Sequence, residues 1–282
     1  MKLNEMKKGI VFDIQRSSFV DGDGVRTTMF FKGCNLKCKW CHNPEGIDKS
    51  IQMLYYKDKC TSCGKCVQIC ETNTKNCTLC GKCTIFCPND AREICGKEYT
   101  EAQLLEIALK DKSYYEGSNG GVTLSGGECM LQIDFIEALL KLLNENTIKT
   151  AIDTAGNVPY EYFQRVIPYT DTFLYDIKCI NEALHIEGTG CSNKLILENL
   201  KRLSKDFNGE ILIRVPVIGG FNDTKEEMLK IKDFLSNINY CKIKLLPYHN
   251  MAKGKALAQG KEFVEFSVPS TEKMEEFKSL FI

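Results

Sequence analysis

The chain has 282 residues, of which 43% are hydrophobic and 26% are charged, and this composition excludes an intrinsically disordered protein. Its 37 basic and 37 acidic residues balance, so a general electrostatic attraction to nucleic acid or to a membrane surface is also excluded. No apolar run reaches the roughly 18 residues of a transmembrane helix, and residues 1–8 contain no apolar signal segment. We therefore expect a cytoplasmic protein with one α/β core and a small additional module.

The sixteen cysteines are the unusual feature of this composition. Eleven of them lie between Cys34 and Cys87, whereas disulfide scaffolds usually spread their cysteines along the chain. In a reducing compartment, clustered cysteines indicate metal or iron–sulfur ligands rather than disulfides. The five others are expected to be buried small hydrophobic residues, and these are Cys95, Cys129, Cys179, Cys191 and Cys241.

The first predicted element is a strand over Thr27–Phe31, and three cysteines follow it on a loop. Cys34, Cys38 and Cys41 supply three thiolates within eight residues. On a cubane iron–sulfur cluster they would leave one iron open to chelate an amino and a carboxylate group. A zinc site is the alternative, but it would need a fourth ligand, for which His42 is the nearest candidate.

Residues 55–95 form a cysteine-rich segment without long periodic runs, which we interpret as an inserted module. It contains two copies of the pattern Cys-x2-Cys-x2-Cys-x3-Cys. This is the ligand pattern of bacterial ferredoxins, in which the fourth cysteine binds the other cluster. Two [4Fe–4S] clusters are therefore expected, one held by Cys60, Cys63, Cys66 and Cys87 and the other by Cys77, Cys80, Cys83 and Cys70.

The segment between the two repeats is shorter than in a ferredoxin. Cys70 is followed by Glu71 where the pattern has proline, and only six residues separate Cys70 from Cys77. That gap is too short for the helix and hairpin that usually fill it, so one cluster with a distorted second site is an alternative. Zinc is another alternative, because any four thiolates can bind it.

Beyond residue 96, apolar runs alternate with amphipathic segments. The runs are rich in β-branched residues, as buried parallel strands are, and they cover Gly121–Leu124, Thr150–Asp153, Thr172–Ile177, Glu210–Val215 and Lys242–Leu246. The amphipathic segments predict helices over Glu101–Asp111, Asp134–Asn144, Tyr160–Val166, Lys194–Lys205 and Lys225–Asn237. Together with the first strand, this alternation predicts an open or closed parallel barrel with its chemistry at the carboxyl ends of the strands.

Chemically active residue types follow several of these strands. Ser125-Gly126-Gly127-Glu128 contains two glycines, which allow a backbone to approach a ligand closely. Asp153 and Asp176 close the next two strands. A carboxylate there is partly buried and charged, so the pair suggests a shared cation or ligand. His249 follows the last strand.

The spacing Cys-x3-Cys-x-Trp-Cys from Cys34 to Cys41 resembles the signature of radical S-adenosylmethionine (SAM) enzymes. The surrounding segment, from Asp21-Gly22-Asp23-Gly24 to Asn43-Pro44-Glu45, resembles the opening of glycyl-radical enzyme activating enzymes, and the resemblance covers nearly the whole chain. That family usually has proline in place of Asp23, so we expect a looser turn. The resemblance implies a partial (β/α)6 barrel formed by residues 1–54 and 96–282, with a ferredoxin-like two-cluster insert at residues 55–95.

The resemblance also implies roles for individual residues. Cys34, Cys38 and Cys41 would hold the [4Fe–4S] cluster that binds SAM, and Gly126 and Gly127 would hold the methionine amino group of SAM in a loop that Glu128 orients. Further SAM contacts are implied for Trp40, His42, Ile177, Lys178, Arg214 and His249, and a monovalent cation is implied at Asp153, Thr154 and Asp176. A core aromatic role for Trp40 and a surface ion pair for Lys178 are the alternatives.

The implied reaction is reductive cleavage of SAM to methionine and a 5′-deoxyadenosyl radical, which abstracts hydrogen from a glycine Cα of a partner protein. Asp21, at the mouth of the barrel, would position that glycyl loop, unless it is only an Asx-turn residue. The insert implies a dehydratase, a C–N or C–S lyase or a decarboxylase as partner, rather than formate-lyase. A flavodoxin or ferredoxin would donate electrons, and the free chain would be monomeric.

Two other functions fit part of the pattern. A radical SAM enzyme that acts on a small molecule would share the motifs, but it would usually close its barrel with C-terminal elements, whereas we expect an open side here. A non-catalytic electron-transfer protein would explain the insert but not the strand-end motifs. The insert itself would either relay electrons or dock the partner.

Overall fold

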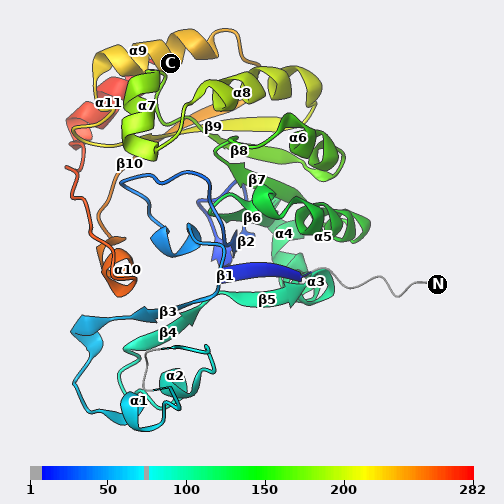
Figure 1. Ribbon diagram of the computed structural model, residues 1–282. Helices are drawn as coiled ribbons and strands as arrows, with labels where there is room; N and C mark the ends of the chain where they lie inside the picture. Colours follow the sequence, from blue (N-terminus) through cyan, green and yellow to red (C-terminus); the bar gives the residue numbers. More distant parts are fainter. Residues whose placement is uncertain (1–7, 73–75) are drawn as a thin grey trace.

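The computed structural model describes residues 8–72 and 76–282 (Figure 1). Within these ranges, one large sheet has the strand order β10-β9-β8-β7-β6-β2-β1-β5. The strands from β10 to β2 are parallel, and they are Arg26–Phe31 (β2), Gly121–Gly126 (β6), Thr150–Thr154 (β7), Thr172–Asp176 (β8), Glu210–Val217 (β9) and Lys242–Pro247 (β10). All six predicted strands are confirmed, and they form the expected partial (β/α)6 barrel.

Helices cover the outer face of this sheet (Figure 1). The five predicted helices are α3 (Glu101–Leu109), α5 (Ile133–Glu145), α6 (Tyr160–Val166), α8 (Lys194–Asp206) and α9 (Lys225–Leu235). The others are α4 (Lys112–Ser118), α7 (Glu182–Thr189), α10 (Lys253–Ala258) and α11 (Thr271–Ser279), with 3₁₀ turns η1 (Pro44–Gly46), η2 (Lys57–Lys59), η3 (Cys129–Gln132) and η4 (Ile167–Tyr169). In the part of the chain that the structure describes, none of the helices is long and apolar enough to cross a membrane.

Two antiparallel strands that the apolar pattern did not predict extend the sheet beyond β2. β1 (Lys8–Ser18) pairs with β2, and β5 (Lys97–Thr100) pairs with β1. The pairing of β1 with β2 is irregular, because its register shifts between Val11 and Asp13 and again before Ser18. Strands near a sheet edge need fewer apolar residues than parallel strands buried on both faces, so these two gave no continuous apolar run.

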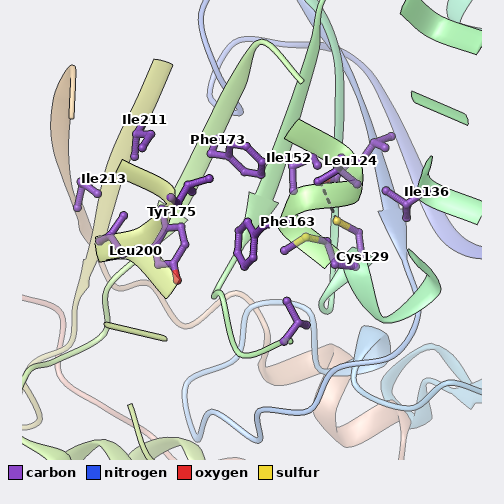
Figure 2. Packing of buried hydrophobic residues seen from close by; sticks show 14 of the residues in the cluster. Leu124, Cys129, Ile136, Ile152, Phe163, Phe173, Tyr175, Leu200, Ile211 and Ile213 are labelled. Atoms are coloured by element: carbon purple, nitrogen blue, oxygen red, sulfur yellow. Dashed lines mark hydrogen bonds between the residues drawn. The ribbon is translucent and has the colours of Figure 1, made fainter. Parts of the chain in front are cut away.

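The main core lies between the parallel strands and the outer helices (Figure 2). Leu124 of β6, Ile152 of β7, and Phe173 and Tyr175 of β8 are at most 1% exposed. Phe163 of α6 packs on both β8 rings, with ring centroids 5.7 Å from Phe173 and 6.2 Å from Tyr175. This packing fixes the strands relative to one another, and therefore also fixes their carboxyl ends.

Five cysteines outside the cysteine repeats were expected to be buried. Cys95, Cys129 and Cys179 are buried, as expected. The expectation is wrong for Cys191, which is partly exposed after α7, and for Cys241, which is exposed before β10. Both lie in connecting segments, where the chain runs over the surface.

The cysteine-rich insert lies to one side of the barrel, at the bottom of Figure 1, and contains a separate two-stranded sheet. Its strands are β3 (Gln52–Tyr55) and β4 (Arg92–Cys95), which pair antiparallel. The one-turn helices α1 (Lys65–Gln68) and α2 (Lys82–Ile85) each follow a glycine in the left-handed conformation, with φ of 74° at Gly64 and 77° at Gly81. The two sequence repeats therefore adopt the same local backbone turn.

Candidate active site

A cavity of about 230 Å³ lies at the carboxyl ends of the parallel strands. It gathers most of the predicted SAM-site residues, namely Asp21, Cys34, Cys38, Trp40, Cys41, His42, Gly126, Gly127, Asp153, Thr154, Asp176, Lys178 and Arg214. Three predicted residues lie outside the lining. Glu128 and Ile177 are each 1% exposed and are buried next to residues that line the cavity. His249 packs on His42, which is part of the lining.

The cysteine loop joins β2 to the segment before η1. Cys34 N donates to Ile47 O at 2.9 Å, and Leu36 N donates to Cys34 Sγ at 3.4 Å. Burial raises the pKa of Cys34 and of Cys41 to about 12, and it also raises the pKa of Cys38. Three neighbouring buried thiolates need a cationic partner, and the irons of a cluster would supply that charge. The donor set therefore fits the predicted cluster.

The two glycines after β6 bring that strand against the cysteine loop. Gly127 N donates to Phe31 O at 2.9 Å, and Glu128 N donates to Gly33 O at 2.7 Å. A Cβ atom at Gly127 would lie 2.7 Å from both the carbonyl carbon of Gly33 and the oxygen of Gly46. Only glycine permits such an approach. The glycines were predicted to admit a ligand, and the structure adds that they admit the neighbouring backbone.

Glu128 ties this turn to the next strand from a fully buried position. Its carboxylate accepts hydrogen bonds from Thr154 Oγ1 at 2.8 Å, from Ala155 N at 3.1 Å and from Met130 N at 3.3 Å. Burial raises the pKa of Glu128 to about 7, although these hydrogen bonds act in the opposite direction. The predicted role of orienting the glycine loop fits these contacts.

Four charged side chains from neighbouring strands form one buried group. Arg214 contacts Asp153, and Arg214 Nε lies 2.8 Å from Asp176 Oδ1. Lys178 Nζ lies 3.1 Å from Asp176 Oδ2, and all four side chains are between 10% and 18% exposed. Burial alone would raise the pKa of Asp176, but Arg214 and Lys178 outweigh it and hold the pKa below its usual value. The ion pair considered for Lys178 therefore exists, in buried rather than surface form.

Two histidines stack beside the cavity. The ring centroids of His42 and His249 are 3.9 Å apart, with an angle of 17° between the rings. Burial, with a smaller contribution from His249, lowers the pKa of His42 to about 4, so this ring is neutral. Among the described residues, His42 Nε2 and His249 Nδ1 are buried without a hydrogen-bond partner. Buried polar atoms of this kind fit a ligand that brings its own donors and acceptors, as adenosine does.

Trp40 is 4% exposed and belongs to a separate apolar cluster with Ile218 and Tyr248. Its ring centroid lies 4.3 Å from that of Phe221. These are the contacts of a core aromatic residue, and Trp40 also lines part of the cavity.

Asp21 contacts the end of β1 and the middle of β2. Its Oδ2 accepts hydrogen bonds from Thr28 Oγ1 at 2.9 Å and from Ser18 Oγ at 2.8 Å. Asp21 also lines the cavity, and its role toward a partner loop stays a prediction. Its position is fixed by the irregular end of β1 that the sequence did not predict.

The eight insert cysteines surround two further cavities in the predicted combinations. Cys60, Cys63, Cys66 and Cys87 line a cavity of about 230 Å³, and Cys70, Cys77, Cys80 and Cys83 line one of about 30 Å³. In each repeat, the backbone N–H two residues after the first cysteine donates to its sulfur at 3.4 Å, as Leu36 does to Cys34. Hydrogen bonds to the sulfurs are one of the means by which proteins tune iron–sulfur clusters.

No three His, Cys, Asp or Glu side chains within residues 8–72 and 76–282 converge on the position of a single metal ion.

Comparison with known proteins identifies the family. Residues 74–235 match the family model of the radical SAM superfamily. The chain is 46% identical to the trans-4-hydroxy-L-proline dehydratase activating enzyme of Clostridioides difficile, over 96% of this chain and 95% of the relative. The chain belongs to the glycyl-radical enzyme activating enzymes. The choline trimethylamine-lyase activating enzyme of Oleidesulfovibrio alaskensis is 38% identical, over 91% of this chain and 89% of the relative.

A solved structure supports the fold of this activating enzyme. The radical SAM methyltransferase from Sphaerobacter thermophilus aligns with a TM-score of 0.57 at 13% identity, over 96% of this chain and 74% of that chain. At this identity the likeness concerns the fold alone. Family membership establishes that the activating enzyme uses a [4Fe–4S] cluster and SAM, and that a glycyl-radical enzyme is its partner.

Some residues of the site were not predicted. Ser125 Oγ donates to Asp153 Oδ2 at 2.7 Å and so holds one carboxylate of the buried charged group. Pro216 and Leu246 line the cavity from β9 and β10. The motif Ser125–Glu128 predicted a role for its glycines and for Glu128 but none for Ser125. An apolar residue at a strand end, such as Pro216 or Leu246, carries no chemical signal in one sequence.

Proposed function

We propose that this activating enzyme binds SAM in the cavity at the strand ends, against a [4Fe–4S] cluster on Cys34, Cys38 and Cys41. The observation that carries the proposal is the gathering of these cysteines, the glycine turn and the buried charged group around one cavity. When bound, the reduced cluster supplies the electron that cleaves SAM, and the resulting 5′-deoxyadenosyl radical takes hydrogen from the glycine of the partner.

The glycine turn is suited to the methionine amino group. The N–H groups of Gly127 and Glu128 are already used to hold the cysteine loop. What the turn offers to a ligand is therefore its carbonyl oxygens, which accept hydrogen bonds from an amino group. Lys178 and Arg214 supply positive charge for the SAM carboxylate and ribose, in a group whose orientation is fixed before the ligand arrives. His249 and His42 would contact adenosine through their free ring nitrogens.

A monovalent cation at Asp153, Thr154 and Asp176 remains part of the proposal, and the buried charged group makes it testable. Arg214 contacts Asp153 and Asp176, so a cation would have to displace part of these contacts. Cleavage of SAM should then depend on the concentration of sodium or potassium. Identical rates in their presence and absence would contradict the cation.

We further propose that residues 55–95 form a two-cluster insert that accepts electrons from a flavodoxin or ferredoxin. The four-cysteine lining of each insert cavity supports this proposal. Val67 and Phe86, next to those cysteines, are at least half exposed and offer apolar surface to a donor protein. Three clusters predict about twelve irons and about twelve sulfides per chain. About four irons and four sulfides per chain would contradict the insert clusters. We also propose that the free chain is monomeric, and light scattering tests this by measuring its mass in solution.

The proposed partner is a glycyl-radical dehydratase that acts on a hydroxyproline. The identity of 46% over nearly the full length supports it, against 38% for the choline lyase relative. The test is to incubate the reconstituted enzyme, SAM and dithionite with a dehydratase of this type or with a choline lyase, and to record the glycyl radical by electron paramagnetic resonance (EPR). A radical on the lyase alone would contradict the proposed partner.

A further inference from the structure

The end of α7 holds the part of the cysteine loop that carries Cys38. Lys37 N donates to Thr189 O at 2.8 Å, and Lys39 N donates to Gly188 O at 2.9 Å. The residues on both sides of Cys38 are thus anchored through their N–H groups to one helical turn, which lies more than 140 residues away in the chain. The position of Cys38 is therefore determined by the shape of that turn.

Close packing reinforces these hydrogen bonds. A Cβ atom at Gly188 would lie 2.7 Å from Trp40 Cζ3 and 2.6 Å from Phe221 Cζ, so the Trp40 ring is seated directly on the turn. Trp40 is the only tryptophan of the chain. Its fluorescence therefore reports on the contact between the cysteine loop and α7.

His185 sets the shape of the turn from a buried position. Its Nδ1 lies 2.6 Å from Cys191 O, and since a carbonyl only accepts, Nδ1 carries the hydrogen. Thr189 Oγ1 donates to His185 O at 2.7 Å and accepts from Cys191 N at 3.3 Å. The turn also contacts the loop directly, because Cys191 Sγ donates to Asn35 O at 3.2 Å.

The other ring nitrogen shows that His185 is not merely filling space. His185 is 1% exposed, and Nε2 has no hydrogen-bond partner among the described residues. A buried polar atom without a partner destabilises the fold relative to an apolar group of similar size. A leucine would thus serve packing better, and what the histidine adds is the single N–H at Nδ1.

We propose that His185 is a positioning residue for the SAM-binding cluster. Through the last turn of α7 it fixes the backbone on both sides of Cys38, one of the three residues that would hold the cluster. This inference rests on the assignment of Cys34, Cys38 and Cys41 as cluster ligands. It concerns a histidine for which the sequence suggested no role.

Two substitutions separate the hydrogen bond from the packing. His185→Leu keeps the volume but removes the N–H, whereas His185→Asn loses volume but places an amide N–H at the position of Nδ1. Each full-length variant is reconstituted anaerobically and reduced with dithionite. The change in its EPR spectrum is titrated with SAM, and Trp40 emission is recorded in parallel. The spectral difference with and without SAM isolates the SAM-binding cluster from the insert clusters.

We expect His185→Leu to raise the apparent Kd for SAM about tenfold and to shift Trp40 emission, because a buried hydrogen bond is worth about that factor. His185→Asn should stay within about twofold of the parent enzyme. A Leu variant equal to the parent, or an Asn variant as weak as the Leu variant, would overturn the proposal. A packing role predicts the reverse order.

A second pair of variants covers the case in which His185→Leu does not fold, as judged by circular dichroism. Thr189→Val removes the hydroxyl at constant volume, and Thr189→Ser keeps it. The valine variant should weaken SAM binding and the serine variant should not, and equal binding by both would overturn the proposal. Failure of the ligand assignment is distinguishable, because Cys38→Ala would then retain the SAM-dependent EPR change.

Discussion

Replacing Gly127 by alanine should displace the cysteine loop without altering the chemistry of any ligand. The new Cβ would lie 2.7 Å from the Gly33 carbonyl carbon and from Gly46 O, against the 3.4 Å at which ordinary contact begins. The loop or the β6 turn must therefore move by at least about 0.7 Å. Forced overpacking of this kind costs about 1–3 kcal/mol of stability. A displacement near 1 Å at a reacting centre can reduce the rate about 100-fold.

The assay is the rate of 5′-deoxyadenosine formation by reconstituted enzyme with dithionite, together with the thermal unfolding midpoint. We expect Gly127→Ala to lower the rate between about tenfold and 100-fold. Gly117→Ala on α4 is the matched control, because its Cβ would meet no atom within 4 Å. A Gly127→Ala enzyme as active as the Gly117→Ala enzyme would refute the argument that the glycine turn fixes the cysteine loop.

Three further predictions concern charge, pH and metal content. Arg214→Met leaves two buried carboxylates with one cation, and it should lower the free energy of unfolding by about 3–5 kcal/mol in chemical denaturation. The control Lys230→Met removes an exposed ion pair with Glu226 and should lower it by less than about 1 kcal/mol. Similar losses in the two variants would contradict the buried charged group. The folded-state pKa of Glu128, about 7, exceeds its ordinary value of 4.5, so the folded protein holds this proton more tightly than the unfolded chain does. Stability should therefore fall as pH rises from about 4.5 to about 7, by on the order of 3 kcal/mol. The Glu128→Gln variant should show a weaker dependence of stability on pH. If the denaturation curves of the parent protein do not change between these pH values, the raised pKa of Glu128 is contradicted. Cys60→Ser should lower iron from about twelve to about eight per chain while SAM cleavage with dithionite persists, and an unchanged iron content would exclude Cys60 as a ligand.

The parallel strands and their end motifs were predictable because their physics is local. A strand buried on both faces needs a continuous apolar run, as in Gly121–Leu124, and a carboxylate at its end, as at Asp153, is then conspicuous. The cysteine spacing was equally informative, because three thiolates in eight residues have few structural explanations. The structure gathers these residues around one cavity.

Other features depend on contacts between distant segments and could not be read from local pattern. Arg214 and Asp153 are 61 residues apart, and the sequence around each of them does not predict their ion pair. β1 carries an irregular polar pattern and becomes a strand only because β2 and β5 flank it. The same is true of His185, whose helix contacts the cysteine loop only in the folded barrel.

We propose that the cluster on Cys34, Cys38 and Cys41 is the one that produces the radical for activation of a partner enzyme. The most direct test is EPR spectroscopy of a glycyl-radical dehydratase mixed anaerobically with this enzyme, SAM and dithionite. The parent enzyme should generate the glycyl radical, and Cys38→Ala should generate none while retaining the insert iron. A glycyl radical of equal intensity with Cys38→Ala would contradict the assignment.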